Sequence, residues 1–157
     1  MTKAELRAEL LRLLHADLEA AERAQQTTHE GATHEEAKPE NDKDTRALEQ
    51  SYLARGQARR VEELRADVGL VVQMPIRDLQ PGERIALGAI VTLDEDGAKS
   101  VVFIAPARGG TELGADRIKV VTPSSPLGRA LIGKVEGDDC EVRVAARTRA
   151  IVIDRVS

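Results

Sequence analysis

The chain has 157 residues, of which 32% are charged and 41% are apolar, and its formal net charge is -4. This composition is typical of a soluble globular protein with one ordinary domain or two small ones. The acidic total argues against free DNA or RNA as the main ligand. With one Tyr, one Phe and no Trp, any core must be built from Leu, Val, Ile and Ala.

The first residues, "MTKAELRAELLRLL", predict the start of a helix and not a secretion signal. They carry acidic residues and lack an apolar run that ends in a small-residue cleavage site. The apolar runs elsewhere are too short to span a membrane. The single cysteine, Cys140, excludes an internal disulfide and lies in a predicted strand, where it suits a small core residue. We therefore expect a cytoplasmic protein without membrane contact.

Regularly spaced leucines predict a first helix over residues 3–28. Leucine recurs at every fourth position from Leu6 to Leu18, which places these side chains on one face. Thr2 and Glu5 have the spacing of a capping box, in which a hydroxyl and a carboxylate satisfy free amides of the first turn. This helix has an apolar face that requires a partner.

A second helix, predicted over residues 40–67, supplies that partner. The leucines stop before Gly31, which predicts the end of the first helix, and Pro39 suits the first turn of the next. Alanines and valines at spacings of three, four and seven residues then mark one face, and Gly56 is explained by close approach of the helices. The sequence thus predicts an antiparallel helical hairpin over residues 1–68.

The remaining residues, 69–157, predict a small, mostly antiparallel β-sheet domain with one short helix. Gly88 inside an apolar run predicts a bulge or a close backbone approach. The short helix is capped by Ser125, has Pro126 at its first position and stops at Gly133. The predicted strands are "LVVQM", "RIALGAIVTLD", "KSVVFIAP", "RIKVV", "CEVRVAA" and "RAIVIDRV". The fold class is therefore α+β.

Three stretches resemble one family. "PENDKDTRALEQSYLARGQARRVEEL", "RIALGAIVTL" and "SPLGRALIGKVEGDDCEV" are similar, in this order along the chain, to segments of the Gre factors, GreA and GreB. The resemblance implies a coiled-coil hairpin followed by a domain of FKBP-like fold. It also implies a monomeric, non-enzymatic transcription elongation factor that binds bacterial RNA polymerase. Such a factor inserts its hairpin into the secondary channel and meets nucleic acid only within the elongation complex.

The same resemblance assigns a docking segment to the short helix of the second domain. It implies that Ser125, Pro126, Leu127 and Arg129 belong to the face that contacts the polymerase. The residues by themselves also support a second interpretation, in which a strand end is followed by a capped helix. The two interpretations are compatible, because a capped helix can form part of a docking surface.

The resemblance assigns the working end to the acidic stretch between the two helices, "HEEAKPENDKD". Candidate tip residues are Glu40, Glu36, Glu35 and Asn41, with Glu40 and Glu36 as ligands of a Mg²⁺ ion shared with the polymerase active site. The family pattern at the tip is Asp-x-x-Glu-Asn, and Ala37 stands where its Asp is expected. Carboxylates also favour helix starts, which explains Glu40 without a metal.

Several alternatives remain open from the sequence. Because of Ala37, a Gre-like factor that modulates polymerase without stimulating cleavage is nearly as well supported as a cleavage factor. An FKBP-like prolyl isomerase is disfavoured, because such pockets are lined with aromatics and this chain has two, Tyr52 and Phe103. A coiled-coil adaptor for another grooved partner is the third class. His29 and His34 lack the cysteines or the spacing of a zinc site.

Overall fold

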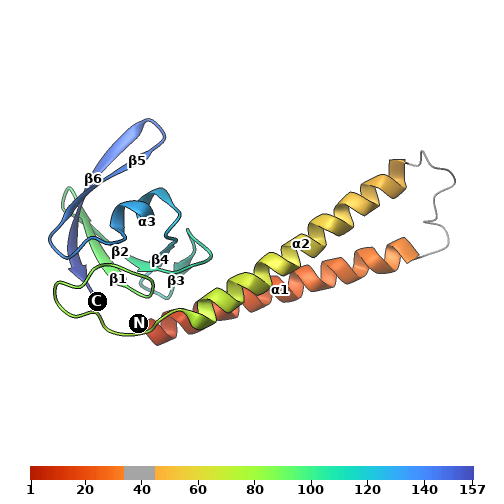
Figure 1. Cartoon of the computed structure of the whole chain (residues 1–157), viewed down its shortest axis with the longest axis horizontal. Coiled ribbons are helices and arrows are strands. Elements are labelled where there is room, and N and C mark those ends of the chain that lie inside the picture. Colours follow the sequence, from red (N-terminus) through yellow and green to blue (C-terminus); the bar gives the residue numbers. More distant parts are fainter. Residues whose placement is uncertain (34–44) are drawn as a thin grey trace. The chain divides into compact units, whose positions relative to one another are not determined.

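The computed structural model describes residues 1–33 and 45–157 (Figure 1). The described chain forms two compact units: Met1–Leu11 together with Leu70–Ser157, and Arg12–Gly69. No helix among the described residues is long and apolar enough to cross a membrane. The predicted domain limits at residues 68 and 69 stay a prediction.

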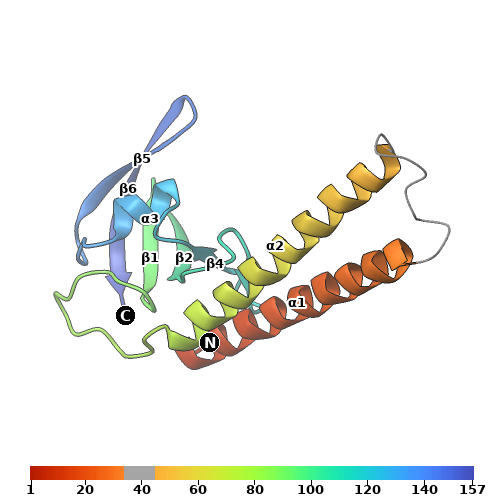
Figure 2. The ribbon, with the colours of Figure 1, turned by 45° about the vertical axis from the view of Figure 1, so that its right-hand side comes forward.

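Two long helices, α1 (Lys3–Thr33) and α2 (Thr45–Gln73), confirm the predicted antiparallel hairpin (Figures 1 and 2). At the start of α1, the amide of Thr2 donates to Glu5 Oε2 at 2.7 Å and the amide of Glu5 donates to Thr2 Oγ1 at 3.2 Å. This is the predicted capping box. It satisfies backbone donors that a first helical turn leaves without partners.

Both helices are longer than predicted where they can be compared. Helix α1 continues through Gly31 to Thr33, because an exposed glycine in a helix costs only about 1 kcal/mol relative to alanine. The stretch "LVVQM" was predicted to be a strand. This prediction is wrong, because Leu70–Gln73 is the end of α2. Val71 is buried and follows the buried Leu64 by seven residues, so it continues the apolar face of the helix. The predicted helix start at Pro39 lies outside the described residues.

The second half of the chain forms one six-stranded sheet, ordered β3-β4-β2-β1-β6-β5. Neighbouring strands are antiparallel except for the parallel pair β2 and β4. The strands are β1 (Ile90–Glu95), β2 (Ala98–Ile104), β3 (Glu112–Leu113), β4 (Ile118–Val121), β5 (Asp139–Val144) and β6 (Arg147–Val156). The mostly antiparallel sheet with one short helix, α3 (Pro126–Leu131), confirms the predicted class.

One face of the sheet carries an apolar core that α3 covers. Leu131 of α3 is fully buried in this core, and Leu127 and Ala130 pack against it. Cys140 is 7% exposed, which confirms its predicted core position, and burial raises the pKa of its thiol. The buried members from the strands and their connections are Ile85, Ala89, Val91, Leu93, Val102, Ile104, Val121, Cys140, Val142, Ile151 and Ile153.

Two predictions about glycines have opposite outcomes. Gly88 has φ +85°, and a Cβ there would lie 2.1 Å from the carbonyl oxygen of Pro75, so the predicted close backbone approach is confirmed. Gly56 is exposed on α2, and a Cβ there would meet nothing within 4 Å. Close approach of the helices is therefore the wrong explanation for Gly56.

Candidate functional site

The predicted docking segment forms a short helix with a well-defined start. Ser125 caps α3, because its hydroxyl oxygen accepts a hydrogen bond from the amide of Gly128 at 3.0 Å. The same hydroxyl donates to the carbonyl oxygen of Thr122 at 2.7 Å. Pro126 occupies the first turn, where its missing N–H leaves no hydrogen bond unmade. The sequence prediction of a Ser cap and a Pro start is confirmed, and Gly133 follows the helix with φ +81°.

Close packing holds this helix against the strand end before it. A Cβ at Gly128 would lie 1.9 Å from the carbonyl oxygen of Thr122, so only glycine allows the approach. Arg129 is exposed and donates from Nη1 to the carbonyl oxygen of Ser124 at 2.6 Å. One guanidinium nitrogen thus fixes the loop, while the exposed side chain keeps its positive charge at the surface.

A cleft of about 460 Å³ opens beside Leu127. Leu93, Val102 and Ile151 from three strands contribute apolar side chains to its lining. Its rim is charged and includes two ion pairs, Arg117 with Glu112 at 2.6 Å and Arg149 with Glu95. Sequence reasoning found Leu127 but not this cleft, because its walls come from segments distant in the chain. An apolar floor with a charged rim suits a side chain or a short segment of a partner polypeptide.

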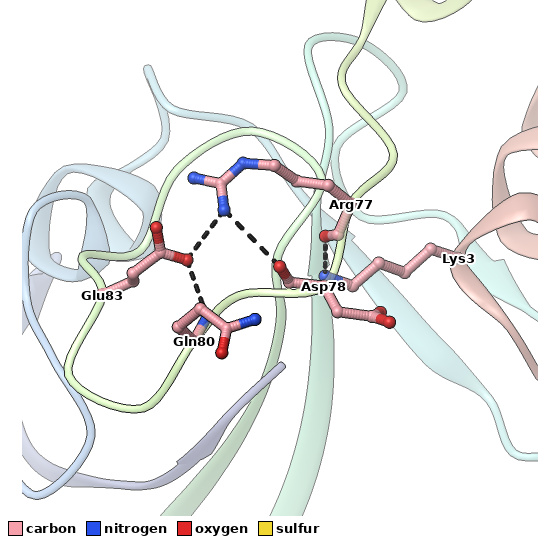
Figure 3. Close-up of polar contacts among 5 residues, drawn as sticks. All are labelled: Lys3, Arg77, Asp78, Gln80 and Glu83. Carbon is pink, nitrogen blue, oxygen red and sulfur yellow. Dashed lines mark hydrogen bonds and ion pairs between the residues drawn. The ribbon is translucent and has the colours of Figure 1, made fainter.

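A polar cluster ties the beginning of α1 to the loop after α2, within one compact unit (Figure 3). Lys3 is 6% exposed, and its Nζ donates to the carbonyl oxygen of Arg77 at 2.6 Å. Burial lowers the pKa of Lys3, and the nearby carboxylate of Asp78 partly offsets this. Arg77 Nη1 lies 2.7 Å from Glu83 Oε2, and the same carboxylate oxygen accepts a hydrogen bond from the amide of Gln80.

Two further contacts attach the first turns of α1 in the same unit. Glu9 Oε2 accepts from the amide of Gly114 at 3.1 Å, and Arg7 Nη1 lies 3.4 Å from the carbonyl oxygen of Met74. These contacts were not predicted from the sequence. Lys3 and Arg7 have the sequence positions of ordinary solvated cations, and their partners are distant in the chain.

The predicted tip residues Glu35, Glu36, Glu40 and Asn41 lie outside the described residues, as do Ala37 and His34. Within residues 1–33 and 45–157, no group of three His, Cys, Asp or Glu side chains is placed to hold a metal ion. That Glu40 and Glu36 bind Mg²⁺ therefore stays a prediction, supported by the preference of Mg²⁺ for carboxylate oxygens. Histidine His29 is exposed on α1, as expected for a solvated side chain.

The capped helix, the cleft and the helical hairpin define a two-part α+β protein. Residues 80–157 match the family described as "Transcription elongation factor, GreA/GreB, C-term". GreA of Brucella anthropi is 38% identical over 87 residues, covering 54% of each chain. GreA of Xanthomonas axonopodis pv. citri is 31% identical over 106 residues, covering 66% of this chain and 62% of the relative. The alignments thus span between about half and three-fifths of these relatives.

Solved structures of similar length also align with the chain. The transcription factor Gfh1 aligns over 99% of this chain and 95% of its own, with 22% identity and a TM-score of 0.41. GreA factor homolog 1 of Thermus thermophilus aligns over 94% of both chains, with 19% identity and a TM-score of 0.40. This similarity is too low to carry a function. On the family match and the curated relatives, residues 80–157 of the chain belong to the GreA/GreB family.

Proposed function

We propose that this chain is a transcription elongation factor that binds bacterial RNA polymerase and stimulates cleavage of backtracked transcripts. The observation that carries the proposal is the family match over residues 80–157, the part of the chain that contains the capped helix α3. The two long antiparallel helices suit insertion into a narrow channel. The factor itself is not an enzyme in this proposal, because the catalytic centre belongs to the polymerase.

Docking is assigned to Ser125, Pro126, Leu127 and Arg129. Arg129 offers an exposed positive charge, and Leu127 borders the cleft of about 460 Å³, so the surface combines charged and apolar contacts. A partner side chain that fills the cleft would remove apolar area from water, which favours binding by roughly 25 cal/mol per Å² before the costs of association. The proposed complex forms in the cytoplasm with a monomer of this chain.

Transcript cleavage is assigned to the acidic tip. Glu40 and Glu36 are the carboxylates that would hold Mg²⁺ together with the polymerase, with Glu35 and Asn41 beside them. A second metal in such a site stabilises the attacking water and the leaving oxygen. Ala37 favours a second candidate function, a factor that occupies the channel and modulates the polymerase without cleavage. An alanine at the expected Asp position removes one ligand.

The experiment adds purified protein to stalled, backtracked elongation complexes and follows the RNA 3′ end on a gel. Under the cleavage proposal, Glu40→Ala and the double variant Glu35→Ala/Glu36→Ala reduce cleavage while polymerase affinity stays nearly constant. Glu62→Ala, an exposed carboxylate of α2, is the matched control and leaves cleavage unchanged.

Ala37→Asp separates the two candidate functions. It should increase cleavage, most clearly at low Mg²⁺, because a correctly placed carboxylate raises metal occupancy. Wild-type protein that binds polymerase but stimulates no cleavage, with activity gained by Ala37→Asp, would establish the modulator. Protein that does not bind polymerase at all would refute both candidates.

A further inference from the structure

Among the described residues of the hairpin unit, 12–33 and 45–69, apolar packing is confined to one section. The buried large apolar side chains there are Leu14, Val61 and Leu64. Beyond Leu18, residues 19–33 of α1 contain no Leu, Ile, Val, Met or aromatic residue. The ion pair between Glu22 and Arg65, at 2.7 Å, places residues 19–26 of α1 opposite residues 61–69 of α2. We call residues 12–26 and 61–69 the apolar section, and residues 27–33 and 45–60 the polar section.

The polar section of α2 does carry large apolar side chains, but α1 does not cover them. Leu48, Tyr52 and Leu53 are 54%, 68% and 54% exposed. The guanidinium of Arg55 lies 6.0 Å from the centre of the Tyr52 ring, which occupies one face of that ring. The apolar residues of this section therefore contribute little to helix–helix packing.

Polar groups and empty space take the place of a packed seam in this section. The side-chain oxygen of Gln57 is buried and has no hydrogen-bond donor. A cavity of about 680 Å³ is lined by residues of both helices, among them Thr28, His29 and Ala54 of the polar section. The ribbons of α1 and α2 also lie farther apart toward Thr33 and Thr45 than in the middle of the hairpin (Figures 1 and 2).

We propose that the polar section opens on its own, losing its helix–helix packing while the apolar section stays closed. Local opening of a segment costs little when it exposes few buried apolar contacts, and this section buries none of the large ones. Opening also gives the buried oxygen of Gln57 access to water, which removes an unfavourable feature of the closed state. The hairpin is thus a closed base with a hinged outer part, whatever its binding partner.

Hydrogen–deuterium exchange of the full chain, resolved by peptide, tests the proposal. Amides of the polar section should exchange at least about tenfold faster than amides of the apolar section. Gln57→Leu should slow exchange in residues 27–33 by about tenfold, because it replaces an unsatisfied polar group by an apolar contact. Gln57→Glu should speed exchange there, since it places a charge in the seam.

Gln73→Leu is the control, the same substitution at an exposed position near the other end of α2, and it should leave exchange in residues 27–33 unchanged. Equal protection of the two sections would overturn the proposal. Fast exchange in the polar section that Gln57→Leu does not slow would also overturn the proposal. In that case the two helices would be fraying separately and not opening along their contact.

Discussion

Gly128 and Gly56 both lie inside helices, yet replacing each by alanine should change stability in opposite directions. A Cβ at Gly128 would lie 1.9 Å from the carbonyl oxygen and 2.8 Å from the carbonyl carbon of Thr122, and 3.0 Å from the Cα of Pro123. All three atoms belong to the backbone, so no side-chain rotation relieves the clash. At Gly56, a Cβ would meet nothing within 4 Å.

The magnitudes follow from these surroundings. Overpacking a buried site costs about 1–3 kcal/mol, and movement of α3 away from Thr122 would weaken the Ser125 cap, worth about 1 kcal/mol. Alanine has a better helix propensity than glycine, which offsets about 1 kcal/mol of this destabilisation. Gly128→Ala should therefore destabilise the unit that contains the sheet (Met1–Leu11 with Leu70–Ser157, the sheet unit) by roughly 1–3 kcal/mol. Gly56→Ala should stabilise the hairpin by about 0.8–1 kcal/mol, since only the propensity gain applies.

Urea unfolding followed by far-UV circular dichroism measures the two changes, with peptide-resolved hydrogen exchange to locate each one. Slower exchange should appear in α2 for Gly56→Ala, and faster exchange in the strands around α3 for Gly128→Ala. A Gly128→Ala protein as stable as the wild type would refute the claim that contact with the Thr122 carbonyl requires glycine. A destabilised Gly56→Ala protein would show that an unidentified constraint acts on α2.

Three further predictions concern stability and docking. A fragment of residues 69–157 should unfold at lower urea concentration than the same unit in the full chain, because it lacks Met1–Leu11, which belong to that unit; equal midpoints would contradict this. Arg129→Glu should weaken polymerase binding in a pull-down or titration by charge reversal at an exposed position, with circular dichroism as the folding control. The hydrogen bond from Arg77 holds the pKa of Glu83 below its ordinary value, so this pair stabilises the fold above the unfolded carboxyl pKa and loses that effect as the pH falls. The stability difference between wild type and Glu83→Gln should thus shrink on acidification, and a pH-independent difference would contradict it.

Periodic sequence patterns predicted the parts of the fold that depend on interactions between residues close together in the chain. Leu6, Leu10 and Leu14 are fully buried, as the four-residue spacing predicts, and Ser125 caps α3 as its position before a proline predicts. The failure at Leu70–Gln73 has a definite cause. Adjacent β-branched residues favour a strand, but burial of Val71 on the face already set by Leu64 keeps the segment helical.

Features that depend on distant contacts could not be predicted. Lys3 has the position of an exposed helical lysine, yet it is buried because its partner, the carbonyl of Arg77, comes from a segment 74 residues away. The cleft beside Leu127 is also built from several strands. By contrast, the tip assignments rest on the sequence alone, because their residues lie outside the described chain.

The position of a residue in the sequence is therefore a poor guide to whether a mutation tests the proposed docking or the proposed tip function. Lys3 and Glu9 are in the hairpin by sequence, but they bond to the loop after α2 and to Gly114 of the sheet unit. Substituting either should disturb the unit formed by Met1–Leu11 and Leu70–Ser157, which contains the proposed docking segment. The bonds around the docking segment are short-range by comparison, since Ser125 and Arg129 bond within residues 122–129. Variants that separate the proposed docking from the proposed tip function should accordingly come from residues 124–129 and from residues 35–41.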